Sequence, residues 1–385
     1  MARLGDICII NPKSPGFDDT LAVSFVPMPK VGENGEFDPS ETREYHKVKK
    51  GFTYFQNDDV LFAKITPCME NGKGAIASNL KNGVGFGSTE FHVLRPMPER
   101  VTSKWLFYLL SWPLLRKDAE KNMTGSAGQK RVPKSFLEEY FINVPELKAQ
   151  KEMTDTLDKV CNLISLRKQQ LAKLDELIKA RFVELFGDVI QNDRGWEQNT
   201  FSDIATSRLG KMLDAKQQTG KYAYPYLANF NVQWFRFEID NLNKMDFNEA
   251  DRQEFELCDG DLLVCEGGEI GRCAVWHNEI QPCFFQKALH RVRCNRHVIL
   301  PDYMAWWFKY NCDHKGFSAI EGAKATIAHL PGAKLKALKV TVPPIELQNQ
   351  FAAFVEQTDK SKLSIQQSLN KLEILKKSLM QKYFG

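Results

Sequence analysis

The sequence predicts two α/β (α+β) domains that alternate with two long helices, and it predicts that these helices form an antiparallel coiled coil. Three observations lead to this fold class. A length of 385 residues suits two or three domains. The chain repeats itself at an offset of 198 residues. Each copy of the repeat ends in a stretch that has the composition of a single uninterrupted helix.

The repeat is clearest at the end of each copy. Residues 144–187 align without a gap on residues 342–385, and eleven of the 44 positions are identical. The identities include both boundaries, because each segment opens on Val-Pro and closes on Phe-Gly. Matching ends argue against chance and indicate a duplicated architecture.

Both segments are predicted to be helices, since they are rich in Leu, Lys, Gln and Glu, start after proline and close on glycine. Apolar residues recur at mixed spacings of three and four, which places them on one face. In the first helix they are Met153, Leu157, Val160, Ile164, Leu171, Leu174, Ile178 and Leu185, and in the second Phe351, Val355, Ile365, Leu369, Leu372 and Leu379. Thr358 and Lys362 interrupt the second stripe, so we expect weaker packing there.

A helix of this length extends about 60 Å, and a narrow apolar stripe requires a helical partner. The other copy is the simplest partner. The alternative is that each helix packs only on its own globular domain.

The globular parts also correspond in order, although more loosely. Short alternating strands bounded by Gly, Asn and Asp are mixed with a few helices, which predicts domains of about 140–150 residues. The expected division is a first domain at 1–143, a central helix at 144–187, a second domain at 188–341 and a C-terminal helix at 342–385. The matching motifs are residues 4–7 with 201–204, 59–63 with 261–265, 72–76 with 271–275, 91–95 with 289–293, and the aromatic runs 105–110 with 303–308.

Composition excludes several classes of protein. With 43% hydrophobic and 26% charged residues and no apolar run near the ~20 needed to cross a bilayer, we expect a soluble protein without a membrane partner. The first residues lack the apolar region of a signal peptide, which favours the cytoplasm. A net charge of +4 is weak support for nucleic-acid binding, so any DNA surface must come from local segregation of charge.

The nine cysteines are predicted to be free thiols, since their number is odd and no pair has C-x-x-C spacing. Six of them lie between residues 258 and 312, near His297 and His314, so a metal site in that region stays open. Small buried thiols explain these cysteines more simply. Trp105, Trp306 and Trp307 lie in helical aromatic runs and are predicted to be core residues.

Order, spacing and duplication together resemble the specificity subunits of type I restriction-modification systems, which act in phage defence. The resemblance covers the whole chain and is carried by the Leu-Gly-Asp-Ile opening at 4–7, the Asp-Val-Leu-Phe strand at 59–62 and the Val-Pro…Gln helix starts at 144–150 and 342–348. It implies that each globular part is a target-recognition domain reading one half of a split, asymmetric DNA site. It also implies that the antiparallel helices fix the spacing between the halves.

The resemblance further implies partners: double-stranded DNA, two methyltransferase subunits and restriction subunits. S-adenosylmethionine, ATP and Mg are then expected in those subunits, with no cofactor or metal bound by this chain. We find no Asn-Pro-Pro-[Tyr/Phe] motif, and the glycine-rich stretches match neither a P-loop nor a dinucleotide fingerprint. We therefore predict a chain without catalytic residues. A nuclease with an unrecognised acidic cluster and a coiled-coil scaffold without DNA affinity remain the alternatives.

Candidate DNA contacts follow from base chemistry, because Arg and Lys recognise guanine, Asn and Gln recognise adenine, and phosphates require only positive charge. Lys47, Lys49 and Lys50 are predicted to neutralise phosphates, since lysines act as point charges. For any single candidate, a solvated surface charge explains the sequence equally well. The predicted contacts are Lys64, Lys73, Gln129, Lys130, Arg131 and Lys134 in the first domain, and Arg272, Gln286, Lys287, Arg291, Lys324 and Lys334 in the second.

The helices themselves are nearly neutral. Residues 144–187 hold 8 basic and 7 acidic residues, and residues 342–385 hold 6 and 4. This composition suits a surface that contacts protein better than one that contacts DNA. We assign the helices and their flanks to methyltransferase docking.

Overall fold

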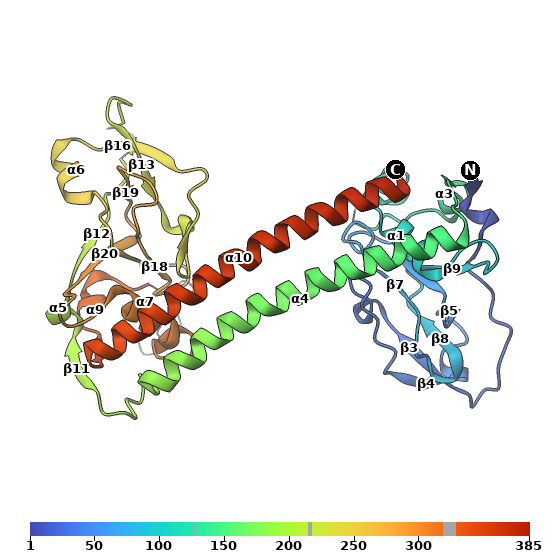
Figure 1. Cartoon of the computed structure of the whole chain (residues 1–385), viewed down its shortest axis with the longest axis horizontal. Coiled ribbons are helices and arrows are strands. Elements are labelled where there is room, and N and C mark those ends of the chain that lie inside the picture. The colour runs from blue at the N-terminus through green and yellow to red at the C-terminus, as the bar shows by residue number, and fades with distance from the viewer. Residues whose placement is uncertain (127, 215–217, 319–328) are drawn as a thin grey trace. The chain divides into compact units, whose positions relative to one another are not determined.

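The computed structural model describes residues 1–126, 128–214, 218–318 and 329–385 (Figure 1). The chain divides into two compact units. Unit 1 combines Met1–Gln169 with Gln366–Gly385, and unit 2 is Gln170–Ile365. The two long helices, α4 (Leu147–Phe186) and α10 (Ile345–Phe384), therefore each contribute one part to unit 1 and another to unit 2.

Apart from these helices, unit 1 consists of short strands, single-turn helices and three short α-helices. In chain order its elements are β1 (Ala2–Arg3), η1 (Leu4–Asp6), β2 (Cys8–Ile10), β3 (Ala22–Val26), η2 (Met28–Lys30), β4 (Thr42–Glu44), η3 (Tyr45–Lys47), β5 (Thr53–Gln56), β6 (Val60–Ala63), β7 (Gly74–Ile76), η4 (Lys81–Gly83), β8 (Val84–Gly87), β9 (Phe91–Pro96), α1 (Ser103–Ser111), α2 (Pro113–Lys121), α3 (Lys134–Glu139) and β10 (Phe141–Ile142).

Unit 2 has a similar succession. Its elements are β11 (Glu197–Thr200), α5 (Phe201–Ile204), β12 (Ala205–Leu209), β13 (Ala223–Leu227), η6 (Asn229–Asn231), β14 (Val232–Gln233), β15 (Arg236–Phe237), β16 (Asn243–Asp246), α6 (Glu249–Phe255), β17 (Leu262–Cys265), β18 (Cys273–Val275), β19 (Phe284–Phe285), β20 (Leu289–Cys294), α7 (Pro301–Asp313), α9 (Gly332–Lys336) and β21 (Lys339–Val342).

The same antiparallel core sheet occurs in both units, with strand order β2-β9-β6-β7 in unit 1 and β12-β20-β17-β18 in unit 2. Strands β6 and β17 are buried along their whole length, because the sheet is covered on both faces. Alternate side chains enter different cores. Val60 and Phe62 pack with the α1 residue Trp105, whereas Leu61 packs with residues of the second sheet such as Phe55.

The second sheet also recurs in outline. Its order is β4-β3-β8-β5 in unit 1 and β16-β13-β19 in unit 2. In each case one parallel pair lies within it, β3 with β8 and β13 with β19. The mixed strands and helices, present twice, confirm the predicted fold class.

The long helices pair within each unit. In unit 1, Leu157 of α4 shares a core with Met380 and Phe384 of α10, and the Phe384 ring lies 5.6 Å from that of Trp105. In unit 2, the rings of Phe182 and Phe186 lie 5.4 and 5.5 Å from that of Phe351. The start of α4 thus pairs with the end of α10, and the end of α4 with the start of α10, so the helices are antiparallel.

The two polar interruptions of the α10 stripe form hydrogen bonds. The Thr358 hydroxyl donates to the Phe354 carbonyl oxygen at 2.8 Å. The Lys362 ammonium lies 2.7 Å from a carboxylate oxygen of Asp175 on α4. Both polar groups are therefore satisfied next to the apolar seam.

Each long helix is tied to its globular part by one buried glutamine. The Oε1 of Gln150 accepts from the Thr102 N–H, and its Nε2 donates to the carbonyls of Arg100 and Pro145. Gln348 makes the same bonds with Leu300, Val298 and Pro343. These six hydrogen bonds explain why glutamine is one of the eleven identical positions in the repeated helices.

The structure also places the tryptophans and the cysteines. Trp105, Trp306 and Trp307 are buried core residues, as predicted. All nine cysteines are free thiols, and among the described residues no group of three or more His, Cys, Asp or Glu could hold a metal ion. Within the same residues, no helix combines the length and the apolar character that a membrane span requires.

Candidate nucleic-acid interface

Loops gather at one edge of the core sheet in each unit. In unit 1, β2 and β6 end at this edge and β9 begins there, because both pair with β9 in antiparallel register. We name it the loop edge. In unit 1 it comprises residues 11–13, 63–66, 88–91, 124–126 and 128–132, and in unit 2 residues 210–214, 265–268, 286–289 and 329–331.

A buried histidine holds the loop edge together in each unit. His92 Nε2 lies 2.8 Å from the Val132 carbonyl oxygen, and its Nδ1 lies 3.1 Å from the Asn11 side-chain nitrogen. These partners require a neutral ring that donates from Nε2 and accepts at Nδ1. In unit 2, His290 Nε2 lies 3.0 Å from the Leu330 carbonyl oxygen. Burial lowers the pKa of both histidines.

An ion pair with a buried aspartate lies toward the opposite end of the same strands. The Arg95 guanidinium donates two hydrogen bonds, of 2.8 and 2.7 Å, to the two carboxylate oxygens of Asp59. Arg293 makes the equivalent pair with Asp261, at 2.6 and 3.1 Å. Hydrogen bonding to these carboxylates raises the pKa of both guanidinium groups. The aspartates of the repeated strand motif therefore join neighbouring strands.

Four of the predicted contacts in unit 1 lie together at the loop edge. Gln129 and Lys130 are exposed on the loop before α3, which Thr124 and Arg131 close by pairing their backbones. Gly125 is required there, since its φ of +121° disfavours side chains. Arg131 donates two hydrogen bonds to Glu90, of 2.9 and 2.8 Å.

The fourth predicted contact at the loop edge is Lys64. Burial lowers the pKa of its ammonium group, and the positive charge of Arg131 lowers this pKa further. The remaining two candidates of unit 1 lie beside this group. Lys73 places its ammonium 3.5 Å from the Met28 carbonyl oxygen, and Lys134 pairs with Glu138 at 2.7 Å on the first turn of α3. Of the lysines predicted to neutralise phosphates, Lys47 pairs with Glu44 and Lys49 with Asp19.

In unit 2, four of the six predicted residues fall into two groups. Gln286 and Lys287 form the turn between β19 and β20 at the loop edge, where Lys287 is exposed. Arg272 and Arg291 instead bind the protein itself. Arg272 donates to the Asn229 carbonyl oxygen at 3.0 Å, and Arg291 donates to the carbonyls of Glu254 and Glu256. The other two predicted contacts are Lys334, which is exposed on α9, and Lys324, which falls outside the described residues.

The two loop edges carry different side chains at equivalent positions. The backbone N–H of Lys64 donates to residue 90 and its carbonyl accepts from residue 132, and Glu266 makes the same two bonds with residues 288 and 330. A basic residue in unit 1 is therefore replaced by an acidic one in unit 2. Arg131 and His329 also occupy equivalent positions. Arg131 forms a backbone bridge with Ile65, which follows β6, and His329 forms one with Gly267, which follows β17.

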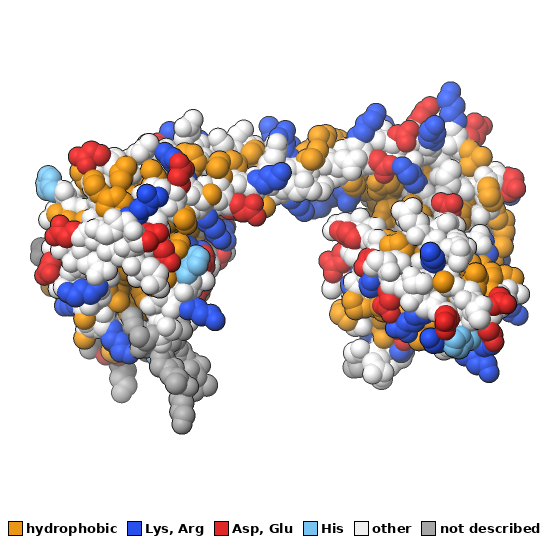
Figure 2. Space-filling model, turned by 90° about the horizontal axis from the view of Figure 1, so that it is seen from below, with side chains coloured by type: hydrophobic (Ala, Val, Ile, Leu, Met, Phe, Trp, Pro, Cys, Tyr) orange, Lys and Arg blue, Asp and Glu red, His pale blue; other side chains and the backbone are white. Residues whose placement is uncertain are grey.

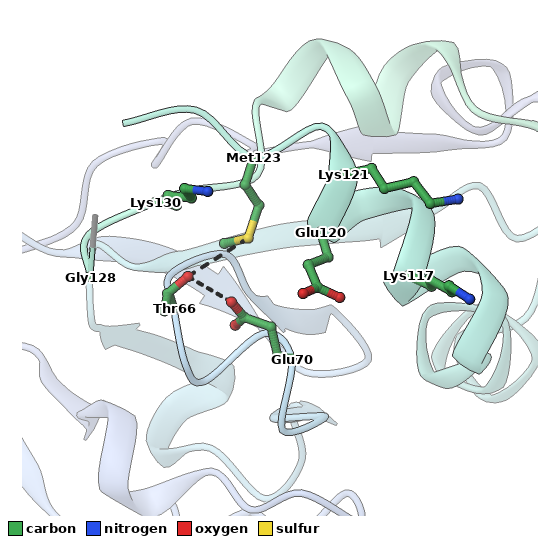
Figure 3. Close-up of a pocket in the computed structure, with 8 residues that line it drawn as sticks. All are labelled: Thr66, Glu70, Lys117, Glu120, Lys121, Met123, Gly128 and Lys130. Carbon is green, nitrogen blue, oxygen red and sulfur yellow. Dashed lines mark hydrogen bonds between the residues drawn. The ribbon is translucent and has the colours of Figure 1, made fainter. Parts of the chain in front are cut away.

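A hollow of about 550 Å³ lies beside the loop edge of unit 1 (Figure 3). Glu70 and Glu120 extend into it, and the Thr66 hydroxyl donates to Glu70 at 2.6 Å. The ammonium groups of Lys117 and Lys121 extend outward from the hollow (Figure 3). Positive charge thus borders the hollow, while its interior is acidic.

Basic and acidic side chains are interspersed over the surface shown in Figure 2. This agrees with a net charge of only +4. Local geometry at the loop edges, rather than a broad basic field, must provide any DNA contact.

Sequence reasoning did not select Lys211, which lies at the loop edge of unit 2. The Lys287 N–H donates to the Lys211 carbonyl oxygen at 2.8 Å, and the Lys211 ammonium lies 2.7 Å from the Asp246 carbonyl oxygen. The partner lies 35 residues further along the chain, and no local pattern in the sequence signals it.

Comparisons with known proteins give one result. The model of the type I restriction modification DNA specificity domain matches residues 1–176 and again 193–374. The EcoAI specificity subunit of Escherichia coli is 44% identical over 173 residues, which is 44% of this chain and 29% of that protein. The EcoEI specificity subunit of the same organism is 42% identical over 175 residues, or 45% and 29%. The chain therefore matches less than a third of the length of these relatives.

Solved structures show the same fold at low sequence identity. A chain from a study of complex assembly and conformational transition of the type I R-M system superimposes with a TM-score of 0.62 at 15% identity, covering 99% of this chain and 96% of that one. The type I restriction-modification S subunit of M. genitalium gives a TM-score of 0.59 at 14% identity, covering 100% and 95%. The two matched segments span most of the sequence, and the chain belongs to the family of type I restriction modification DNA specificity domains, which it contains twice.

Proposed function

We propose that this chain is the DNA-reading subunit of a type I restriction-modification system. Residues 1–143 and 188–341 act as two target-recognition domains, and each reads one half of a split, asymmetric site in double-stranded DNA. One observation carries the proposal. The histidine and backbone contacts inside unit 1 are repeated inside unit 2, whereas the side chains that the two loop edges expose are different.

The chemistry of the loop edges supports base reading. In unit 1, the Gln129 amide can bind adenine, and Lys130 and Arg131 can bind guanine or phosphate. In unit 2, Gln286 and Lys287 take these roles. Lys64, Lys134 and Lys334 suit phosphate contacts, and Lys324 stays in the predicted set on its sequence position alone.

Three predicted residues take a supporting role in this proposal. The side chains of Lys73, Arg272 and Arg291 donate to backbone carbonyls of their own unit. Moving them to DNA would break these hydrogen bonds within the unit. We therefore assign them to the shape of the loop edge rather than to base contact.

Catalysis is assigned to partner subunits in this proposal. Methyltransferase subunits supply S-adenosylmethionine chemistry, and restriction subunits supply ATP- and Mg-dependent cleavage. The family assignment and the specificity subunits among the relatives support this division. The test adds S-adenosylmethionine, ATP and Mg²⁺ to the purified chain with DNA, and any methylation or cleavage would overturn the division.

The long helices are proposed to dock the methyltransferase. They expose large apolar side chains, and Figure 2 shows apolar and basic groups side by side on their surface. In unit 2, a groove of about 830 Å³ lies between the end of α4 and α7, lined by Phe182, Trp306 and Tyr310 among others. The exposed large apolar residues are Leu147, Leu163, Leu166, Ile374 and Leu375 in unit 1, and Leu177, Val183 and Leu363 in unit 2.

Alanine substitutions at these positions should abolish co-purification with the methyltransferase and leave DNA binding by the chain unchanged. Persistence of the complex would contradict the docking assignment.

Selection from a library of random DNA duplexes tests DNA reading itself. The full-length chain should enrich one motif made of two short defined segments separated by a spacer of fixed length. Its affinity should fall steeply as salt rises, because phosphate contacts release counterions. A scaffold without DNA affinity would instead enrich no motif, and its weak binding would not depend on salt.

A further inference from the structure

The loop that connects β12 to β13 begins at the loop edge of unit 2. Its described residues are 211–214 and 218–222. Lys211 forms a backbone bridge with Gln286, and the Lys287 N–H donates to the Lys211 carbonyl oxygen. The loop therefore starts beside the two residues of unit 2 that are proposed to read bases.

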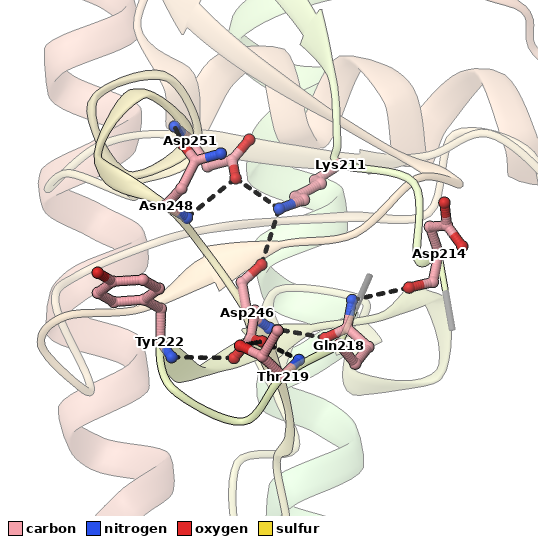
Figure 4. A network of polar contacts seen from close by, with 8 residues as sticks. All are labelled: Lys211, Asp214, Gln218, Thr219, Tyr222, Asp246, Asn248 and Asp251. Carbon is pink, nitrogen blue, oxygen red and sulfur yellow. Dashed lines mark hydrogen bonds and ion pairs between the residues drawn. The ribbon is translucent and has the colours of Figure 1, made fainter. Parts of the chain in front are cut away.

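Asp246, at the end of β16, fixes the far part of this loop (Figure 4). Its carboxylate accepts from the N–H and the hydroxyl of Thr219, at 2.5 and 2.8 Å. It also accepts from the N–H groups of Gly220 and Tyr222, at 2.9 and 3.0 Å. One buried carboxylate thus accepts four hydrogen bonds from three residues of the segment 219–222.

The Lys211 ammonium group is bound inside the same network. Its ammonium lies 2.7 Å from the Asp246 carbonyl oxygen, 2.5 Å from an Asp251 carboxylate oxygen and 5.1 Å from the centre of the Phe247 ring. Lys211 is therefore a structural residue of the loop and is not available to phosphate without breaking these contacts.

Three of the side chains that the described part of the loop presents to solvent are large and apolar. Met212 is 62% exposed, Leu213 43% and Tyr222 41%. The Lys221 ammonium lies 5.4 Å from the centre of the Tyr222 ring. Large apolar side chains that are exposed on a loop lose their contact with water only if a partner covers them.

The corresponding segment of unit 1 is different. Phe17, in the loop between β2 and β3, packs inward on the rings of Tyr45 and Tyr54, at 5.4 and 5.9 Å. Phe17 and Leu21 of the unit 1 loop are partly buried and pack against a core cluster, whereas the loop of unit 2 exposes three large apolar side chains. Exposed apolar side chains at this place are a property of one copy and not of the shared scaffold.

We propose that Met212 and Leu213 read thymine in the half-site of unit 2 through its C5-methyl group, and that Asp246 is the positioning residue that presents their loop. The proposal rests on the proposed function. Apolar contact with this methyl group is the way in which a side chain without polar atoms distinguishes a base in the major groove. The neighbouring Gln286 and Lys287 have the complementary chemistry for purines.

Uracil tests the methyl contact, because it pairs as thymine does but lacks the methyl group. The full-length chain is titrated with its selected duplex and with duplexes carrying uracil in one half-site or the other. We expect uracil in the half-site of unit 2 to weaken binding about 5- to 10-fold, as loss of one specific base contact does. Met212→Ala combined with Leu213→Ala should abolish this discrimination, and Phe141→Ala, an exposed apolar residue of unit 1 outside the loop edge, should preserve it.

Asp246→Ala tests the positioning role. Specificity should be lost in the half-site of unit 2, while the half-site of unit 1 is still selected and thereby reports a folded chain. Equal affinity for thymine and uracil in the wild-type chain, or a unit 2 half-site without thymine, overturns the methyl contact. Unchanged selection by Asp246→Ala overturns the positioning role. Failure of the proposed function looks different, since the wild-type chain would then enrich no bipartite motif.

Discussion

His92 and His290 show how single buried residues support a surface that they do not reach. Each ring contacts the carbonyl of a residue at the loop edge, Val132 in unit 1 and Leu330 in unit 2. The exposed side chains of the two loop edges differ, but the histidine does not. Its role is therefore to hold the backbone of the loop edge in place, while other residues provide the contacts.

We predict that His92→Ala lowers the free energy of unfolding by about 1–3 kcal/mol, because the Val132 carbonyl and the Asn11 amide lose a buried partner. Urea denaturation measures this change. The same variant should lose selection in one half-site only, and His290→Ala should lose it in the other. If both variants affected the same half-site, the histidines would not act within their own units.

The histidines also predict a pH dependence. Burial lowers their pKa from the ordinary value of 6.5, so as the pH falls below that value the unfolded chain binds protons that the folded chain excludes. The free energy of unfolding should therefore decrease on acidification, until the pH reaches the lowered pKa of the folded state. A chain with both His92→Gln and His290→Gln should lose less stability than the wild type between about pH 7.5 and about pH 5.5. Equal losses would contradict the assignment.

At the scale of elements, much of the fold follows from simple sequence patterns. The helices expected at 144–187 and 342–385 begin at Leu147 and Ile345, just after their prolines, and end one residue before the closing glycines. The strand β6 corresponds to an apolar run at 60–63 in the sequence. Strand pairing could not be predicted, since it joins segments such as β3 and β8 that lie about sixty residues apart.

The site was less predictable than the elements. Residue type alone does not reveal whether an arginine faces solvent or caps a carbonyl, and Arg272 and Arg291 do the latter. Among the described loop residues 211–214 and 218–222 the basic residues are Lys211 and Lys221, and the contacts of residues 219–222 depend on Asp246, which lies beyond β13. Prediction therefore succeeded where the pattern is local and missed contacts between distant segments.

The start of each long helix can be tested directly. Gln348→Ala removes one hydrogen-bond acceptor and two donated bonds in a buried place, so we predict a loss of about 3 kcal/mol in the free energy of unfolding. The neighbouring Asn349→Ala is the control, because its amide is exposed and bonds only to the preceding turn. Thermal or urea unfolding distinguishes the two. Similar losses for both variants would show that the buried glutamine has no special role.

For Lys362, a polar residue on the apolar stripe of α10, we predict a gain in stability on substitution rather than a loss. Lys362 is half-buried on the apolar stripe, and its partner Asp175 stays largely exposed. Lys362→Leu should therefore stabilise the chain by about 1 kcal/mol, since apolar burial replaces a partly desolvated ion pair. Lys360→Leu, at an exposed position of the same helix, should leave the stability unchanged. Destabilisation by Lys362→Leu would show that its ion pair with α4 contributes more than packing does.

At the scale of the whole molecule, duplication is the central feature. One sheet, one histidine contact, one ion pair and one glutamine anchor occur twice, and α4 and α10 join both copies into one chain. The two loop edges carry unlike side chains on this common frame. A molecule built in this way can bind two unlike half-sites, while a symmetric duplication would bind two equal ones.

The most direct measurement compares the DNA motifs selected by three full-length chains from one random duplex library. These are the wild type, a variant with Gln129→Ala and Lys130→Ala, and a variant with Gln286→Ala and Lys287→Ala. We predict a bipartite, asymmetric motif for the wild type, with one half degraded by the first variant and the other half by the second. A single contiguous motif, or loss of the same half in both variants, would contradict the claim that each domain reads its own half-site.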